Sequence, residues 1–220
     1  MNESSKSKRW FDAAQSAALR GRVLDIGAGS DPVTADAVVF DLAQGDANRI
    51  TEFASETFDC VYSSHCLEHM IEPATTLANW WSLVKPGGWL FLIVPDEDLY
   101  EQGVFPSRFN ADHKSTFTLS KKRSWSKRSF NVFDLCSTLP GARIESLLLN
   151  DIGYERSAAT HGPMPRRGLV PRLRRFYDSL RKRGLMRRAS AFERHTAAAG
   201  VRDQTVGPAM AQIEALVRKV

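Results

Sequence analysis

The sequence predicts an α/β protein with a doubly wound, mostly parallel sheet, and two short apolar runs carry this prediction. Val23–Ile26 has the composition of a buried parallel strand, and the glycines within 27–29 end it. A second run follows at Val38–Phe40 and leads directly into Asp41. Because ligands of open α/β sheets bind at the carboxyl ends of the strands, the glycine turn and Asp41 mark the expected binding edge.

The length and composition indicate one domain with a proper core. The chain has 220 residues, 43% of them hydrophobic, and no apolar run reaches the length that spans a bilayer. Residues 1–9 are charged and lack an apolar segment, so no secretory signal is expected. The three cysteines lack metal-ligand spacing, which predicts reduced thiols in a cytoplasmic protein. The net charge of +5 allows an acidic partner without requiring one.

The glycine turn argues against a dinucleotide site. Pro32 stands where the third glycine of that fingerprint belongs, and Asp25 would meet a pyrophosphate with a like charge. A ligand that carries an ammonium and a sulfonium would instead be attracted by this acid. The alternative is a glycine turn that binds nothing.

Three segments together resemble class I S-adenosylmethionine-dependent methyltransferases of the type-11-like kind. They are Val23–Gly29, His65–His69, and the turn Lys85–Trp89 with the apolar strand at 90–94 behind it. The resemblance covers roughly residues 20 to 150. It implies a seven-stranded Rossmann-like sheet and S-adenosylmethionine as the cofactor.

The resemblance also assigns cofactor-binding residues. It implies that Asp41 binds the ribose hydroxyls and that Asp46 and Ala47 bracket the adenine. Residues that leave the strand at 58–64 would face the methionine part of the cofactor and the substrate. The full implied set is Asp25, Gly27, Ala28, Gly29, Asp41, Asp46, Ala47, Ser64 and His65.

Helical spacing of apolar residues predicts a helix over 8–20 that stops at Gly21. Only eight residues separate Gly29 from Val38, so the first crossover is expected to be shortened to a turn. The second crossover is short as well, because the turn at 45–48 follows Asp41 closely.

The middle of the chain continues the alternation of strands and helices. A strand is expected at 58–64, and Pro73 suits the first turn of a helix over 73–84. Trp80 and Trp81 lie on the apolar stripe of this helix and are expected in the core. After the strand at 90–94, the remaining expected elements are a polar loop at 95–114, a basic helix at 118–138, and strands at 142–149 and 211–217.

Methyl transfer depends on alignment of the reactants and often on a base for the acceptor proton. Histidine suits that task near neutral pH. His113, in the polar loop, is the first candidate for the catalytic base and His65 the second, the alternative for each being a structural role. The spacing of histidine, cysteine and aspartate predicts no metal site.

We expect a single methyltransferase domain over 1–220, with the cofactor-binding core at 20–150. A basic helical insertion at 156–204 precedes the last strand, within 205–220. The helix predicted in the insertion has an apolar stripe on one face and a group of arginines on another. Three interpretations stay open for 166–195: a lid, an ordinary core-packing helix, or contact with an anionic membrane surface.

The polar loop resembles methyltransferases associated with bacterial surface polysaccharides. The predicted function is therefore O-methylation of a sugar or another small polar acceptor, by a cytoplasmic or membrane-peripheral enzyme. An RNA methyltransferase is the second enzyme hypothesis, although no RNA-binding module is recognisable and a nucleic-acid partner is not expected. A binding protein that keeps the cofactor fold without catalysis is the third.

Overall fold

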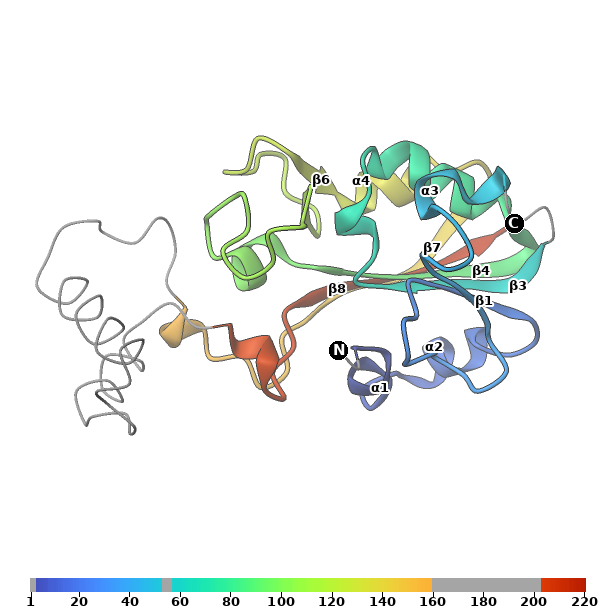
Figure 1. Ribbon diagram of the computed structural model, residues 1–220, viewed down its shortest axis with the longest axis horizontal. Helices are drawn as coiled ribbons and strands as arrows, with labels where there is room; N and C mark the ends of the chain where they lie inside the picture. The colour runs from blue at the N-terminus through green and yellow to red at the C-terminus, as the bar shows by residue number, and fades with distance from the viewer. Residues whose placement is uncertain (1–2, 53–56, 160–202) are drawn as a thin grey trace, which may run out of the picture.

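The computed structural model describes residues 3–52, 57–159 and 203–220 and shows one central six-stranded sheet with helices on both faces (Figure 1). The strand order is β2-β1-β3-β4-β8-β7. The strands are β1 Val23–Ile26, β2 Val38–Phe40, β3 Phe58–Ser64, β4 Val84–Pro95, β7 Ala142–Asn150 and β8 Gln212–Lys219. The first four run parallel, whereas β8 runs antiparallel to both of its neighbours. The predicted fold class is confirmed at this level.

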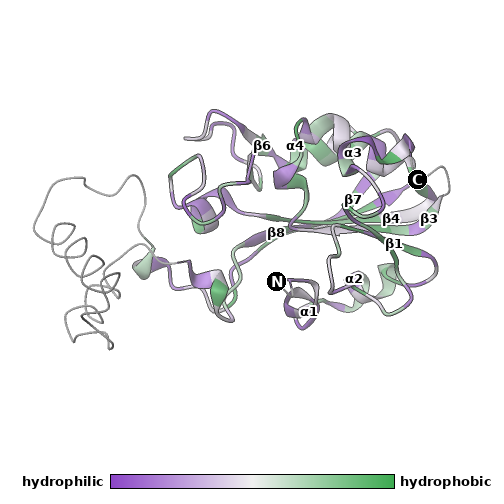
Figure 2. Cartoon of the chain, viewed as in Figure 1, coloured by the Kyte–Doolittle hydropathy of each residue, from purple (hydrophilic) through white to green (hydrophobic). Residues whose placement is uncertain are grey.

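Side chains of the central strands alternate between two cores. One core lies against α3 (Pro73–Ser82) and α4 (Val132–Ser137), and the other lies against α2 (Ala13–Ala18) on the opposite face. Hydrophobic residues gather along the sheet and on these helices (Figure 2). Burial of both faces explains why β4 contains an unbroken apolar run at 90–94.

The described residues contain six strands in this sheet rather than the seven that the resemblance implies. Between β2 and β3 they form only the 3₁₀ segment η1 (Ala47–Glu52), in which Ile50 alone is buried. A segment with one buried side chain offers little apolar surface with which to extend the sheet. Both early crossovers are short, as their spacing predicts, and residues 29–37 form no helix.

The single helix expected over 8–20 is wrong, because the chain forms α1 (Glu3–Lys8) and α2 instead. Asp12 begins α2 with a capping box. Its side chain accepts the Gln15 backbone N–H at 2.7 Å, while Gln15 Oε1 accepts the Asp12 N–H at 2.8 Å. This reciprocal pair of hydrogen bonds marks the start of α2, so the helix predicted from residue 8 cannot continue through Asp12. Phe11 precedes it and packs on Phe91, with ring centroids 4.8 Å apart.

The helix predicted over 73–84 is confirmed, and both tryptophans lie in the core. The Trp80 indole N–H donates to the Ala47 carbonyl at 2.9 Å, and that of Trp81 donates to the Pro140 carbonyl at 2.9 Å. The turn predicted at 85–89 lies within β4, where the pairing with β3 shifts register.

The basic helix predicted over 118–138 is also wrong. The region instead holds the two-stranded parallel sheet β5 (Thr116–Thr118) and β6 (Ser129–Asn131), followed by the short α4. The fully buried Glu97, in the π-helical turn η3 (Glu97–Glu101), organises it. Its carboxylate accepts hydrogen bonds from Thr116, Lys121, Ser124 and Ser129. Polar side chains that a solvent-exposed helix would present to water instead donate hydrogen bonds to the buried Glu97 carboxylate.

Residues 160–202 lie outside the described residues, so the interpretations of 166–195 stay predictions. The segments on either side are η4 (Arg156–Ala158) and η5 (Gln204–Val206). Gln204 accepts the Glu155 backbone N–H at 2.8 Å and donates to the Glu155 carbonyl at 2.9 Å. We call this pair of hydrogen bonds the neck. Within the described ranges, each helix is too short or too polar to cross a bilayer.

Candidate active site

A cavity of about 330 Å³ lies at the carboxyl ends of β1 and β3. The glycine turn after β1 lines one side, and residues 64–69 with His113 line another. Residues of α1 and the start of β8 complete its wall. The cavity therefore occupies the edge of the sheet where the sequence predicts ligand binding.

The glycine turn forms a cradle at this cavity, which Gly27, Ala28 and Gly29 all line. Gly27 has a φ of +81°, and a Cβ atom there would lie 2.7 Å from the Cys66 Cβ. Gly29 has a φ of +57°, but a Cβ atom there would meet nothing within 4 Å. Packing thus requires the first glycine, whereas the second faces open space that a ligand can enter.

Two predicted acids support the turn from behind and do not line the cavity. Asp41 accepts the N–H groups of Gly29 and Leu42, both at 2.7 Å. Asp25 accepts the Val33 N–H at 2.6 Å, and burial raises the pKa of its carboxyl to about 7 despite that hydrogen bond. Both carboxylates hold the cradle in shape.

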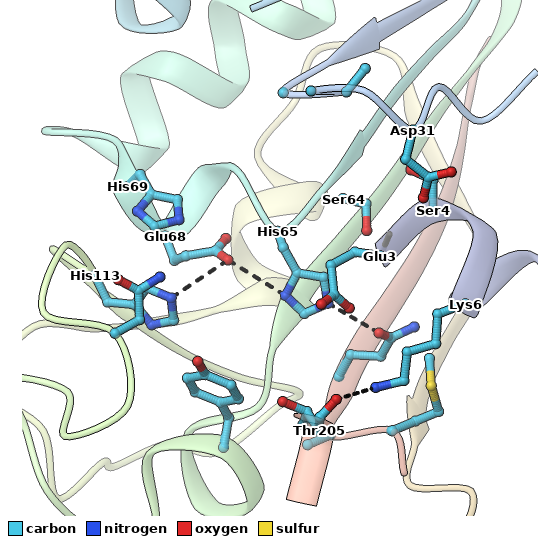
Figure 3. A pocket seen from close by; sticks show the side chains of 18 of the residues that line it. Glu3, Ser4, Lys6, Asp31, Ser64, His65, Glu68, His69, His113 and Thr205 are labelled. Carbon is cyan, nitrogen blue, oxygen red and sulfur yellow. Dashed lines mark hydrogen bonds and ion pairs between the residues drawn. The ribbon is translucent and has the colours of Figure 1, made fainter. Parts of the chain in front are cut away.

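Asp31 lines the cavity and was missed by sequence reasoning. It accepts the Ser5 backbone N–H at 2.8 Å and so joins the cradle to α1. Its place directly after the glycine turn was the available signal. α1 thus lies at the mouth of the cavity, as Glu3 and Lys6 also show (Figure 3).

Asp46 and Ala47 lie in or next to η1 and do not line the cavity. The Asp46 side chain accepts the Asn48 side-chain amide at 2.8 Å and the Asn48 backbone N–H at 2.9 Å, and both bonds favour its charged form and lower its pKa. The Ala47 carbonyl is bonded to Trp80. The structure therefore does not bring these two residues together with the cradle.

Ser64 and His65 leave β3 and line the cavity, as the sequence predicts. His65 Nδ1 lies 3.5 Å from Glu68 Oε1, and its Nε2 lies 3.1 Å from Gln212 Oε1. Burial opposes a charge on His65, but the Glu68 carboxylate outweighs it and raises the pKa of His65 to about 9. At neutral pH the pair is thus an imidazolium and a carboxylate.

His113 reaches the same cavity from the polar loop (Figure 3). Its Nδ1 lies 2.7 Å from Glu101 Oε1 and its Nε2 lies 3.9 Å from Glu68 Oε1. The Tyr100 ring stacks on it, with centroids 5.2 Å apart. The two predicted histidines therefore meet through Glu68, which was singled out only as part of a motif.

Glu68 and His69 complete this wall. Glu68 is fully buried and its charge is favoured by the histidines around it, which lower its pKa against the effect of burial. His69 Nδ1 lies 2.9 Å from Asp112 Oδ2, and its ring lies 5.0 Å from that of His113. We call Glu68, His69 and His113 the acceptor-side cluster.

The family follows from the sequence over most of its length. A family model described as a methyltransferase domain matches residues 6–176. The chain belongs to this methyltransferase family. It is an S-adenosylmethionine-dependent methyltransferase, and the cradle, with open space at Gly29 and acids around it, fits a cationic donor.

Several solved structures are similar to the chain at low sequence identity. A candidate sarcosine dimethylglycine methyltransferase from Galdieria sulphuraria is 10% identical, with a TM-score of 0.52 over 97% of this chain and 84% of that one. A candidate methyltransferase from Bacillus halodurans C-125 is 19% identical, with a TM-score of 0.47 over 94% and 96%. The plantazolicin methyltransferase BamL, solved with S-adenosylhomocysteine, is 14% identical, with a TM-score of 0.42 over 99% and 81%. No curated protein matches the chain.

Proposed function

We propose that this methyltransferase O-methylates a hydroxyl group of a sugar or another small polar acceptor. One observation carries the proposal: the glycine cradle and the acceptor-side cluster line a single cavity. A donor on the cradle and a hydroxyl at the cluster would then share one cavity. Alignment of reactants in such a space is the main contribution that this chemistry asks of a protein.

Polar side chains around the cluster suit an acceptor that carries several hydroxyl groups. Tyr100, Asn110 and Gln212 line the cavity together with the histidines. Hydroxyl, amide and imidazole groups can donate and accept hydrogen bonds with neighbouring hydroxyls. An apolar acceptor would bury this polar wall without offering it any further hydrogen bond, at a cost in affinity.

His113 is the residue that acts on the acceptor hydroxyl in this proposal. Glu101 holds its Nδ1, so Nε2 is the atom that faces the cluster. It either takes the hydroxyl proton itself or holds a cation that acidifies the hydroxyl. The donor supplies a methyl group on a sulfonium. The cradle, whose shape Asp41 supports, and Ser64 would keep this donor in place.

An anionic surface is proposed as a further partner through residues 166–195. Support for it comes from the arginine content of that segment in the sequence. A lipid-linked glycan would present a hydroxylated acceptor at such a surface, which makes the two proposals compatible.

The decisive experiment is an acceptor screen with an isotope-labelled methyl donor. Sugars, nucleotide-sugars and RNA would be offered in parallel, after calorimetry has established that the protein binds S-adenosylhomocysteine. We expect label in a hydroxylated small molecule, and His113→Ala should lower turnover about 10²–10⁴-fold with cofactor affinity unchanged. Label in RNA alone would contradict the proposal, as would full activity in His113→Ala for the role of that residue.

A further inference from the structure

We propose that the acceptor-side cluster binds a divalent first-row transition-metal cation. The inference rests on the proposed function, because it places the cation where the acceptor hydroxyl would enter. Glu68, His69 and His113 each offer one ligand atom, and these atoms all lie within 4.8 Å of one another. All three residues line the cavity, so a cation between them would be open to a substrate.

The first argument is the state of the Glu68 carboxylate. Its side chain is 1% exposed, and neither oxygen has a hydrogen-bond partner. The nearest imidazole nitrogens, on His65 and His113, lie 3.5 and 3.9 Å from Oε1. A buried carboxylate in proteins is normally hydrogen-bonded or coordinated to a metal ion, because isolation in a low dielectric is costly. The His65 imidazolium balances this charge in part without a close hydrogen bond, and a cation among these groups would give the carboxylate a direct partner.

The second argument is the way in which both histidines are held. His113 has its Nδ1 on Glu101 at 2.7 Å, and His69 has its Nδ1 on Asp112 at 2.9 Å. Metal-binding histidines typically donate one ring N–H to a carboxylate, which orients the ring and makes the other nitrogen a better ligand. In both residues the arrangement leaves Nε2 for a cation.

The ligand set selects the class of metal. Two imidazoles and one carboxylate suit Zn²⁺ or Mn²⁺, whereas Mg²⁺ and Ca²⁺ prefer oxygen ligands alone. Bonds of about 2.1 Å in a tetrahedral site separate ligand atoms by about 3.4 Å. The His113–Glu68 pair, now at 3.9 Å, would close by about half an ångström. Three protein ligands leave at least one position for a hydroxyl group.

The cation would take the place of a general base, because it would make the acceptor hydroxyl more acidic. A hydroxyl group on a divalent cation loses its proton far more readily than a free one. The O–H bond breaks, the proton passes to water, and the electron pair stays on the oxygen as the nucleophile. His113 then acts as a ligand rather than as the proton acceptor. Sequence reasoning predicted no metal because the ligands are two adjacent residues and a distant histidine.

Calorimetric titration of chelator-treated protein with Zn²⁺ and with Mn²⁺ tests the inference, with Mg²⁺ as the comparison. The variants are Glu68→Gln and His69→Asn, the second at a side chain that is only 25% exposed, and Glu72→Gln is the matched control. Glu72 lies in the same segment but is exposed, and it pairs with Arg128 at 3.3 Å. We expect one equivalent of Zn²⁺ or Mn²⁺ in wild type and in Glu72→Gln, with affinity at least about tenfold lower in both site variants.

Thermal unfolding supplies a second measurement that needs no substrate. The cation should raise the melting temperature of wild type and Glu72→Gln but not of the site variants. No saturable binding, or wild-type affinity in Glu68→Gln and His69→Asn, would overturn the inference. Methylation that persists after chelation would overturn it and leave the proposed function standing. A metal-loaded protein that methylates no hydroxyl would instead overturn the proposed function and leave the metal site standing.

Discussion

The glycine cradle makes a sharp prediction, because its two glycines are constrained for different reasons. Gly27→Ala and Gly29→Ala introduce the same methyl group into the same turn. At both positions φ is positive, at +81° and +57°, so each alanine adopts a left-handed conformation. That conformation costs a non-glycine residue about 1–2 kcal/mol.

Only the first position adds a steric overlap. A Cβ atom at residue 27 would lie 2.7 Å from the Cβ and 2.8 Å from the Sγ of Cys66, which is buried. Overpacking of this kind costs about 1–3 kcal/mol. Gly27→Ala should therefore lower the free energy of unfolding by about 2–5 kcal/mol, against about 1–2 kcal/mol for Gly29→Ala.

Urea unfolding and titration with S-adenosylhomocysteine separate the two effects. Gly29→Ala should lose cofactor affinity with only a small loss of stability, because its methyl group enters the open space of the cradle. Gly27→Ala should lose stability first. Equal destabilisation by the two variants would refute the packing argument, and unchanged cofactor affinity in Gly29→Ala would refute the assignment of the cradle.

Three further predictions concern Asp41, Asp25 and the basic segment. Asp41→Ala removes the carboxylate that accepts the Gly29 N–H. Loss of a hydrogen bond to a charged group costs about 1.5–3 kcal/mol, so S-adenosylhomocysteine binding should weaken roughly tenfold to a hundredfold. Equal affinities of the two proteins in calorimetry would show that Asp41 does not support cofactor binding. The Asp25 pKa is raised from about 3.9 in the unfolded chain to about 7 in the folded one. Neutral Asp25 thus stabilises the fold fully below about pH 4, and this contribution is lost as the pH rises through 7. Asp25→Asn should remove that loss from urea-unfolding curves at pH 4–8, and an unchanged pH dependence would contradict the assignment. Deletion of 166–195 should abolish low-salt co-sedimentation with anionic vesicles, and equal binding by the deleted chain would end the membrane hypothesis.

The central sheet could be predicted because its strands are specified locally. Val23–Ile26 and Phe58–Ser64 are buried along nearly their whole length, so apolar residues predominate in each, and their bounds match the sequence prediction. The wrong helices depended on single polar residues. Asp12 ends one helical pattern by capping the next helix, and Glu97 gathers its partners from far along the chain. Periodicity does not detect a buried acid that acts over such a separation.

The candidate site likewise has one part that a local motif predicts and another that only the fold brings together. The glycine turn is one short motif, and its position at the cavity follows from the strand that precedes it. His65 and His113 were selected for their chemistry, but nothing in the spacing of the chain placed Glu68 between them. Asp46 and Ala47 came from the resemblance, and they lie away from the cavity because the second crossover is reduced to η1.

The neck has a consequence for how this enzyme could diversify. Gln204 and Glu155 hold the two ends of the intervening stretch side by side, so the sheet does not depend on that stretch to bring β7 and β8 together. Lengthening a loop whose ends already meet costs little, about 0.6 kcal/mol per doubling of its length. Thr205 and Met210 follow the neck and line the cavity, so the neck fixes where the chain re-enters the site. Changes in the length of the chain between Glu155 and Gln204 can therefore accumulate in evolution without moving the cradle or these two residues.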